Sequence, residues 1–143
     1  MTVIAYDGKY LYSDSLAIGS NGNISIANNK IKKFKFSEHY NYIASAGRYR
    51  DILRIYSILN QVRWFDKTEY DFDVTFLLID KNKQPKLYRF DSNELLVKDN
   101  LKLPIIFGSL AKEVKKVFKE SNDILFSLKQ VCGVNNPINI VKI

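Results

Sequence analysis

Apolar residues along this chain recur in two spacings, one typical of strands and one typical of helices. The opening stretch, MTVIAYDGKYLYSD, holds two apolar runs on either side of the dipeptide Asp7-Gly8. This dipeptide is typical of a two-residue turn between antiparallel strands. The pattern therefore predicts an opening β-hairpin in which Thr2, near the start of the first strand, faces Ser13 on the second.

Later segments also have the composition of strands. Residues 72–80, FDVTFLLID, are apolar on both faces, which predicts a central strand that is covered on both sides. Residues 42–47, YIASAG, have small side chains and end at a glycine, which predicts close packing against them. Residues 15–29 are rich in Gly, Ser and Asn, and we expect a loop with a short edge excursion. Further strands are predicted at residues 30–36, 86–90, 95–97, 105–107 and 137–143.

Three segments have helical periodicity. The first helix is predicted from Asp51 to about residue 64, with an apolar stripe made of Ile52, Ile55, Tyr56, Leu59 and Val62. The second is predicted at residues 110–120 with Ser109 as its N-cap, and the third at residues 123–132. The basic side chains that lie off the first stripe are expected to face solvent: Arg50, Arg54 and Arg63.

The order of these elements predicts the fold class. Runs of strands separated by blocks of helices indicate an α+β fold, in which helices cover antiparallel sheet. We find no linker, internal repeat or low-complexity segment, so residues 1–143 are expected to form a single domain. No segment approaches the length of a membrane span, and the N-terminus lacks the layout of a signal peptide. A cytoplasmic protein that does not enter a membrane is therefore expected.

Composition narrows the possible chemistry. The chain has one histidine, His39, in a polar turn, and one cysteine, Cys132, on the apolar face of its helix. Because no residues have metal-ligand spacing and no phosphate-binding loop occurs, neither a metal nor a cofactor is expected. Catalysis would have to come from Thr, Ser, Asp or Lys. The net charge of +7 permits nucleic-acid binding, but the lysines are spread along the chain, which is typical of a solvated surface.

Thr2 is a candidate nucleophile because of its place in the chain. Removal of Met1 would give Thr2 a free α-amine, and such an amine serves as the base for the hydroxyl of the same residue. In the predicted register Met1 faces Asp14, so a carboxylate lies beside the chain start. The simpler interpretation is a surface hairpin that begins with threonine, and the hairpin alone leaves both interpretations open.

Short motifs follow one another along most of the chain: MTVIAYDGKYLYSDS, KIKKF, IASAG before Asp51, LLID, KLYRFD, IFGS before a helix, and INIVKI. This ordered set resembles the proteasome β-subunit family of N-terminal nucleophile (Ntn) hydrolases, particularly small phage-encoded versions. The resemblance implies a four-layer αββα sandwich, in which two antiparallel sheets lie between helical layers. It also implies a homo-oligomer and, for a phage protein, a location in the host cytoplasm.

The resemblance also implies a threonine-peptidase mechanism with assigned residues. Thr2 would attack a peptide carbonyl once Met1 is removed, and Asp14 would orient a lysine that lowers the pKa of the site. Gly47 would supply a backbone N–H to the oxyanion. Ser109 would correspond to the serine near the nucleophile's amine.

The identity of the lysine is left open between two residues of KIKKF. The spacing from Asp14 favours Lys30, whereas the spacing back from Gly47 favours Lys33. The two lysines lie three apart, so on one strand they would face opposite sides, and only one could point inward. We prefer Lys30.

Three functions therefore remain in competition. The first is a threonine peptidase that acts on a peptide or protein substrate. The second is a catalytically inactive proteasome-like protein that binds a host protein or protein complex. Residues 131–136, VCGVNN, favour this second hypothesis, because they lack the Asp and Ser that the family carries before its last strand. The third is a basic nucleic-acid-associated protein, although the sequence offers no aromatic platform for base stacking.

Overall fold

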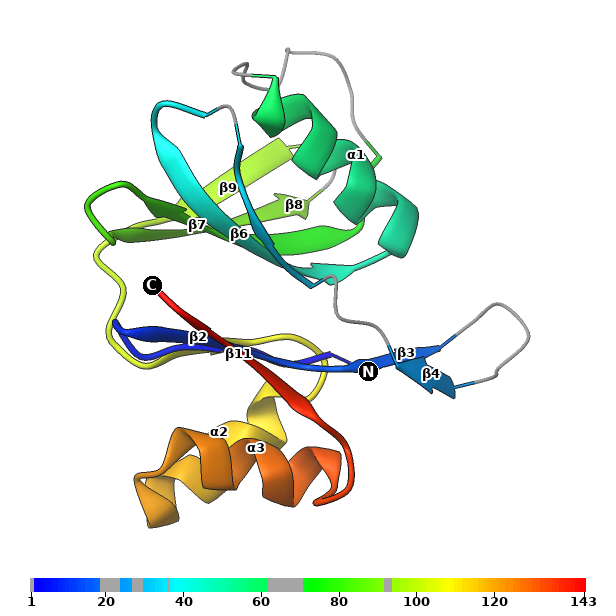
Figure 1. Ribbon diagram of the computed structural model, residues 1–143, viewed down its shortest axis with the longest axis vertical. Helices are drawn as coiled ribbons and strands as arrows, with labels where there is room; N and C mark the ends of the chain where they lie inside the picture. The colour runs from blue at the N-terminus through cyan, green and yellow to red at the C-terminus, as the bar shows by residue number, and fades with distance from the viewer. Residues whose placement is uncertain (1, 19–23, 27–29, 36, 62–70, 92–93) are drawn as a thin grey trace. The chain divides into compact units, whose positions relative to one another are not determined.

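The computed structural model describes residues 2–18, 24–26, 30–35, 37–61, 71–91 and 94–143 (Figure 1). The described residues form an α+β fold with two large antiparallel sheets and three helices, so the predicted fold class is confirmed. The chain forms two compact units, of which the first combines residues 1–31 and 102–143 and the second comprises residues 32–101.

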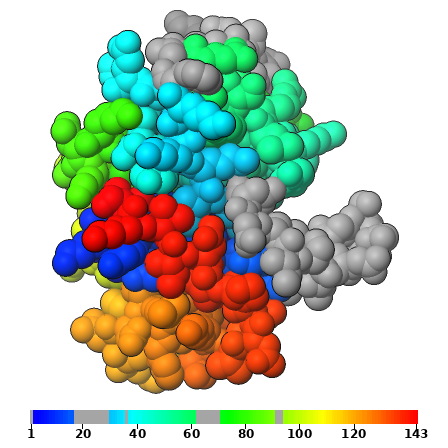
Figure 2. All heavy atoms as spheres, viewed as in Figure 1, coloured from blue at the N-terminus to red at the C-terminus, as the bar shows by residue number. Residues whose placement is uncertain are grey.

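The first unit contains a four-stranded sheet in the order β10-β1-β2-β11, with two helices on one face (Figure 1). Its strands are β1 (Ile4–Tyr6), β2 (Tyr10–Asp14), β10 (Ile105–Phe107) and β11 (Ile138–Lys142). The helices are α2 (Ala111–Ser121) and α3 (Ile124–Cys132), whose side chains pack together in Figure 2. A separate two-stranded sheet joins β3 (Leu16–Ile18) to β4 (Ile24–Ile26). The core between sheet and helices includes Val3, Ala5, Tyr12, Ile106, Val114 and Leu128.

The opening hairpin is present, but its register differs by two residues from the predicted one. Ile4, not Thr2, faces Ser13. Continuing this register places Val3, not Met1, across from Asp14, and the Asp14 N–H donates to the Val3 carbonyl over 3.2 Å. Met1 itself lies outside the described residues. Thr2 therefore lies one residue beyond the position across from Asp14.

The turn chemistry of Asp7 explains the shifted register. Its Oδ1 accepts hydrogen bonds from the backbone N–H groups of Lys9 at 2.9 Å and Tyr10 at 2.7 Å. Asp7 therefore precedes the turn, and Gly8 and Lys9 form the loop, with Gly8 at a φ of 97° that favours glycine. The other carboxylate oxygen accepts from the Tyr12 hydroxyl, and burial together with this bond raises the pKa of Tyr12 to about 12.

The second unit contains a five-stranded sheet in the order β5-β6-β7-β8-β9 and the helix α1 (Tyr49–Asn60) (Figure 1). Its strands are β5 (Ile31–Lys33), β6 (Tyr40–Gly47), β7 (Val74–Asp80), β8 (Pro85–Asp91) and β9 (Glu94–Lys98). The strand predicted to be central, β7, is central, and Phe76 through Ile79 are buried. The helix buries Ile52, Ile55, Ile58 and Leu59 in a core that includes Phe76, Leu78 and Tyr88.

Several predicted boundaries are wrong. Residues 15–29 contain the paired strands β3 and β4, because short apolar alternations flank their Gly- and Asn-rich middle. Helix α1 was predicted to begin at Asp51 but begins at Tyr49. The Asp51 carboxylate accepts a hydrogen bond from Asp73 N–H at 3.2 Å. The predictions for Phe36, Val62 and Arg63 fall outside the described residues. Within the described part of the chain, no helix has the length and apolar character needed to cross a membrane.

Candidate active site

The backbone of Thr2 is held by the segment that joins β10 to α2. The Thr2 N–H donates to the Ser109 hydroxyl over 2.9 Å, and the Thr2 carbonyl accepts from Leu110 N–H over 3.1 Å. Gly108 makes this approach possible, because a Cβ at that position would lie 2.3 Å from the Thr2 carbonyl oxygen. Its φ of 113° also disfavours any residue with a side chain. The sequence analysis did not predict this role of Gly108. The position of the glycine between a predicted strand and a predicted helix was the feature that could have indicated it.

Ser109 was predicted to cap α2, and this prediction is wrong. The N-cap position belongs to Leu110, and no side chain caps the helix there. The Ser109 hydroxyl accepts from the Thr2 N–H instead. The structure thus places Ser109 beside the nitrogen of Thr2.

Asp14 lies at the end of β2 and is fully buried. One carboxylate oxygen accepts from Val3 N–H at 2.9 Å. The other accepts from Leu16 N–H at 3.1 Å and from the Lys30 ammonium at 2.8 Å. The carboxylate therefore connects a buried cation to the residue that follows Thr2, and this arrangement fixes both groups relative to the sheet.

The structure brings Lys30, and not Lys33, to Asp14. The Lys30 residue is 8% exposed, and its ammonium also donates to the Leu16 carbonyl over 2.6 Å. Lys33 is exposed in β5 of the second unit, with its ammonium 6.0 Å from the centroid of the Tyr42 ring. The comparison of the two lysines assumed that side chains alternate between the two faces of one strand. Lys30 immediately precedes β5, so this alternation does not apply to it.

Gly47 ends β6 in the second unit, with a φ of 142°. A Cβ there would lie 2.1 Å from the Asp73 carbonyl oxygen, so the predicted close packing at this glycine is present. Its assignment as the oxyanion donor stays a prediction from the resemblance.

The segment before the last strand closes α3. Gly133 N–H donates to the Lys129 carbonyl, and the Asn136 side-chain amide donates to the Cys132 carbonyl. These contacts satisfy the end of the helix. The Asp and Ser that the resemblance implies before the last strand do not occur in residues 131–136, where Gly133 and Asn136 bond to the end of the helix.

Cys132 is buried on α3, as predicted for a small apolar residue. Burial raises its pKa to about 11, the Asp14 carboxylate adds to the rise, and Lys30 opposes it. At pH 8 only about one thiol in a thousand is then a thiolate, which is the reactive form.

We therefore expect iodoacetamide to alkylate the native protein at pH 8 at least about a hundredfold more slowly than it alkylates free cysteine. Guanidinium unfolding should restore the rate of free cysteine. A mass-spectrometric time course with and without denaturant measures both rates. Fast alkylation of the native protein would contradict the burial of Cys132.

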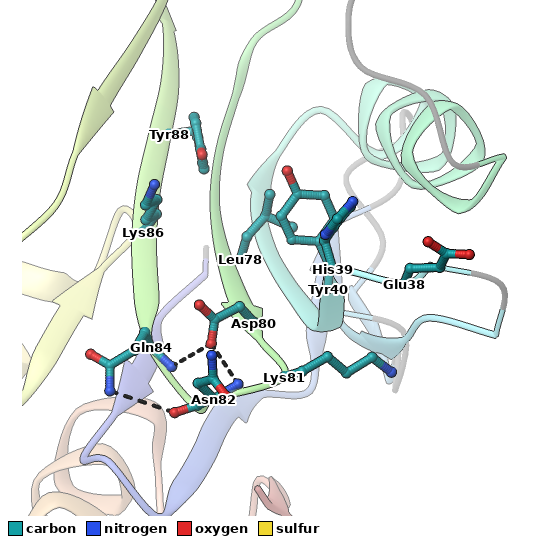
Figure 3. Close-up of a pocket in the computed structure, with 10 residues that line it drawn as sticks. All are labelled: Glu38, His39, Tyr40, Leu78, Asp80, Lys81, Asn82, Gln84, Lys86 and Tyr88. Atoms are coloured by element: carbon teal, nitrogen blue, oxygen red, sulfur yellow. Dashed lines mark hydrogen bonds between the residues drawn. The ribbon is translucent and has the colours of Figure 1, made fainter.

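A pocket of about 400 Å³ lies in the second unit, over the ends of β6, β7 and β8 (Figure 3). Tyr40 and Tyr88 line it together with His39, Lys81 and Lys86. Burial raises the pKa of Tyr88 to about 12. The pocket holds none of the sequence-predicted site residues. Among the described residues, no three His, Cys, Asp or Glu side chains gather closely enough to hold a metal ion.

Solved structures of Anbu and HslV proteins have this fold. Anbu (ancestral beta-subunit) from Yersinia bercovieri is 15% identical, with a TM-score of 0.68 over 99% of this chain and 81% of that one. HslV from Trypanosoma brucei is 9% identical, with a TM-score of 0.62 over the full length of both chains. Anbu from Pseudomonas aeruginosa, solved as a helical assembly, is 14% identical, with a TM-score of 0.64 over 100% and 81%. No family model and no curated protein matches the sequence. The chain thus has the proteasome-like fold of Anbu and HslV.

Proposed function

We propose that this chain is a threonine peptidase whose nucleophile is the Thr2 hydroxyl after removal of Met1. The observation that carries the proposal is the buried Lys30–Asp14 ion pair, which the Asp14 carboxylate connects to Val3 N–H beside Thr2. The proteasome-like fold supports the same interpretation.

Stability alone does not account for the buried Lys30–Asp14 ion pair, so the pair favours a chemical role for these residues. Taking two charges out of water costs several kcal/mol per ion, and apolar residues of similar volume are often equally stable in such places. A fixed cation near a hydroxyl has a chemical use, since it favours the ionised form of that hydroxyl and lowers its pKa. Lys30 is the cation that supplies this effect in the proposal, and Asp14 holds it in place.

The proposed reaction has two steps. In the first, the α-amine of Thr2 takes the proton of the Thr2 hydroxyl, and Oγ1 forms a bond to the carbonyl carbon of a peptide. The carbon–nitrogen bond of that peptide breaks, and the proton passes from the α-ammonium to the leaving amine. In the second step, a water gives its proton to the same amine and attacks the ester. The acid product leaves, and the Thr2 hydroxyl regains its proton.

Ser109 has a positioning role in this scheme. Its hydroxyl already accepts from the nitrogen of Thr2, so it would hold the amine that serves as the base. Gly47 is proposed as the oxyanion donor on the resemblance alone.

Intact mass and covalent labelling test the proposal in one natively purified sample, which keeps any homo-oligomer intact. We expect the mass to lack one methionine, and an electrophilic peptide probe to attach once per chain. Tandem mass spectrometry should place the probe on Thr2. Full retention of Met1 would block the amine and contradict the proposal, as would a free Thr2 that no probe labels. A defined host protein that co-purifies with an unlabelled chain would favour the non-catalytic binder.

A further inference from the structure

Strand β9 lies at one edge of the five-stranded sheet in the second unit and is open to solvent. Within the described residues, no strand pairs with its outer side. All residues of β9 except Leu95 are exposed, including Leu96 (41%) and Val97 (54%). Every second residue of an edge strand directs its N–H and C=O groups outward, so this edge is a template on which another strand can form hydrogen bonds.

The strand at the opposite edge of the same sheet, β5, is protected against such pairing. It spans only three residues, Ile31–Lys33, and the last two are lysines. Short length and lysine side chains are two of the means by which edge strands avoid other strands. In contrast, β9 has five residues, and its charges lie only at its two ends. Its middle, Leu95–Val97, contains no charge, proline or glycine.

The sequence of β9 is complementary to itself. When two copies pair antiparallel about Leu96, Glu94 of each copy faces Lys98 of the other. Opposite charges that face each other across two strands stabilise the pair. In the same register Leu96 faces its own equivalent, and Val97 faces Leu95. The strand therefore offers both charge pairing and apolar contact to a second copy of itself.

The hydrophobic core of the second unit reaches this free edge at Val97. Phe76 on β7 faces Tyr88 on β8, and Tyr88 faces Val97 on β9, so the three residues form one row across the sheet. Phe76 and Tyr88 are buried, and their stacked rings have centroids 5.1 Å apart. A second copy would continue the row with its Leu95, a residue that packs against this core in each chain. The exposed end of the core would then be covered.

We propose that β9 is a homodimer interface, in which two copies of this chain pair their β9 strands antiparallel about Leu96. The pairing joins the five-stranded sheets of the two copies into one continuous sheet and closes both exposed edges. The occupant of the edge is a second copy, because the charges of Glu94 and Lys98 are complementary to those of the same strand in this register. The inference goes beyond the proposed peptidase function and concerns the second unit alone.

Oxidative cross-linking of a cysteine variant of the full chain tests the inference. Leu96→Cys places two thiols opposite each other across the dimer, where Cα atoms lie about 4.5–5.5 Å apart, a distance that a disulfide spans. Diamide should therefore convert the folded variant into a covalent dimer on a non-reducing gel. The wild-type chain should stay monomeric on the same gel, because its cysteine, Cys132, is buried.

Ile140→Cys is the matched control. Ile140 is 45% exposed at the middle of β11, which is also an edge strand, and self-pairing there would set Lys142 against Ile138 without any complementary charge. This variant should give no covalent dimer. A dimer yield equal to that of Leu96→Cys would show that the cross-link reports exposure alone and would overturn the inference.

Charge variants in the Leu96→Cys background test the register. Lys98→Glu sets two carboxylates against each other at each end of the pair and should lower the yield of covalent dimer severalfold. Addition of Glu94→Lys restores opposite charges and should restore the yield. Absence of the dimer in Leu96→Cys, the result expected if the edge binds a peptide of another protein, would overturn the inference, as would a yield that Lys98→Glu leaves unchanged. Cross-linking requires no peptidase activity, so this result is independent of whether a probe labels Thr2.

Discussion

Replacement of Thr2 by alanine is expected to abolish peptide hydrolysis and to leave the protein folded. The side chain of Thr2 supplies the nucleophile in the proposed mechanism, so its loss should lower the rate at least about a thousandfold. The hydrogen bonds that Thr2 makes in the structure use its backbone N–H and carbonyl, which alanine retains. The melting temperature should therefore change by no more than about 2 °C. Hydrolysis of a fluorogenic peptide library and thermal melts measure the two effects.

Two matched variants make this experiment decisive. Thr2→Ser keeps a hydroxyl beside the α-amine and should retain measurable turnover. Thr75→Ala alters a half-buried threonine in β7 of the second unit and should leave turnover unchanged. If Thr2→Ala hydrolysed peptides at the wild-type rate, the nucleophile would lie elsewhere, and the hydrolysis would not be that of an N-terminal threonine.

Most of the fold could be predicted from the sequence because its elements have strong periodicity. The continuous apolar run of β7 and the stripe of α1 can each pack in few ways, and both were placed close to where the structure has them. The register of the opening hairpin could not be predicted in this way. It depends on whether Asp7 lies inside or before the turn, and the hydrogen bonds of its carboxylate to Lys9 and Tyr10 decide that.

Like the fold, the candidate site could be predicted from the sequence only in part. The sequence named Thr2, Asp14 and Lys30, but the choice between Lys30 and Lys33 needed the burial that only tertiary structure provides. The periodicity predicted Ser109 as a helix cap, and only the resemblance related it to the amine of Thr2, to whose nitrogen it is bonded. The close approach of Gly108 to Thr2 was not predicted. These contacts join residues about a hundred positions apart in the sequence, and no local pattern records them.

Lys30→Met and Lys33→Met are expected to differ sharply in both stability and turnover. Loss of the Lys30 ammonium leaves the Asp14 carboxylate buried with an uncompensated charge, which should destabilise the protein by about 3–5 kcal/mol. It also removes the cation that lowers the pKa of the Thr2 hydroxyl in the proposed mechanism, so turnover should be lost. Lys33 is exposed, and its replacement should change stability by no more than about 0.5 kcal/mol and leave turnover intact. Chemical denaturation and peptide hydrolysis measure both variants.

The double variant Lys30→Met with Asp14→Asn separates the structural role of the ion pair from its chemical role. It removes both charges, and the single side-chain oxygen of the asparagine can accept from the N–H of Val3 or of Leu16, but not from both. Part of the lost stability should return, because no buried charge is left unpaired. Turnover should stay lost, because no cation faces the hydroxyl. If turnover returned together with stability, Lys30 would serve the fold alone, and the proposed lowering of the pKa of Thr2 would be wrong.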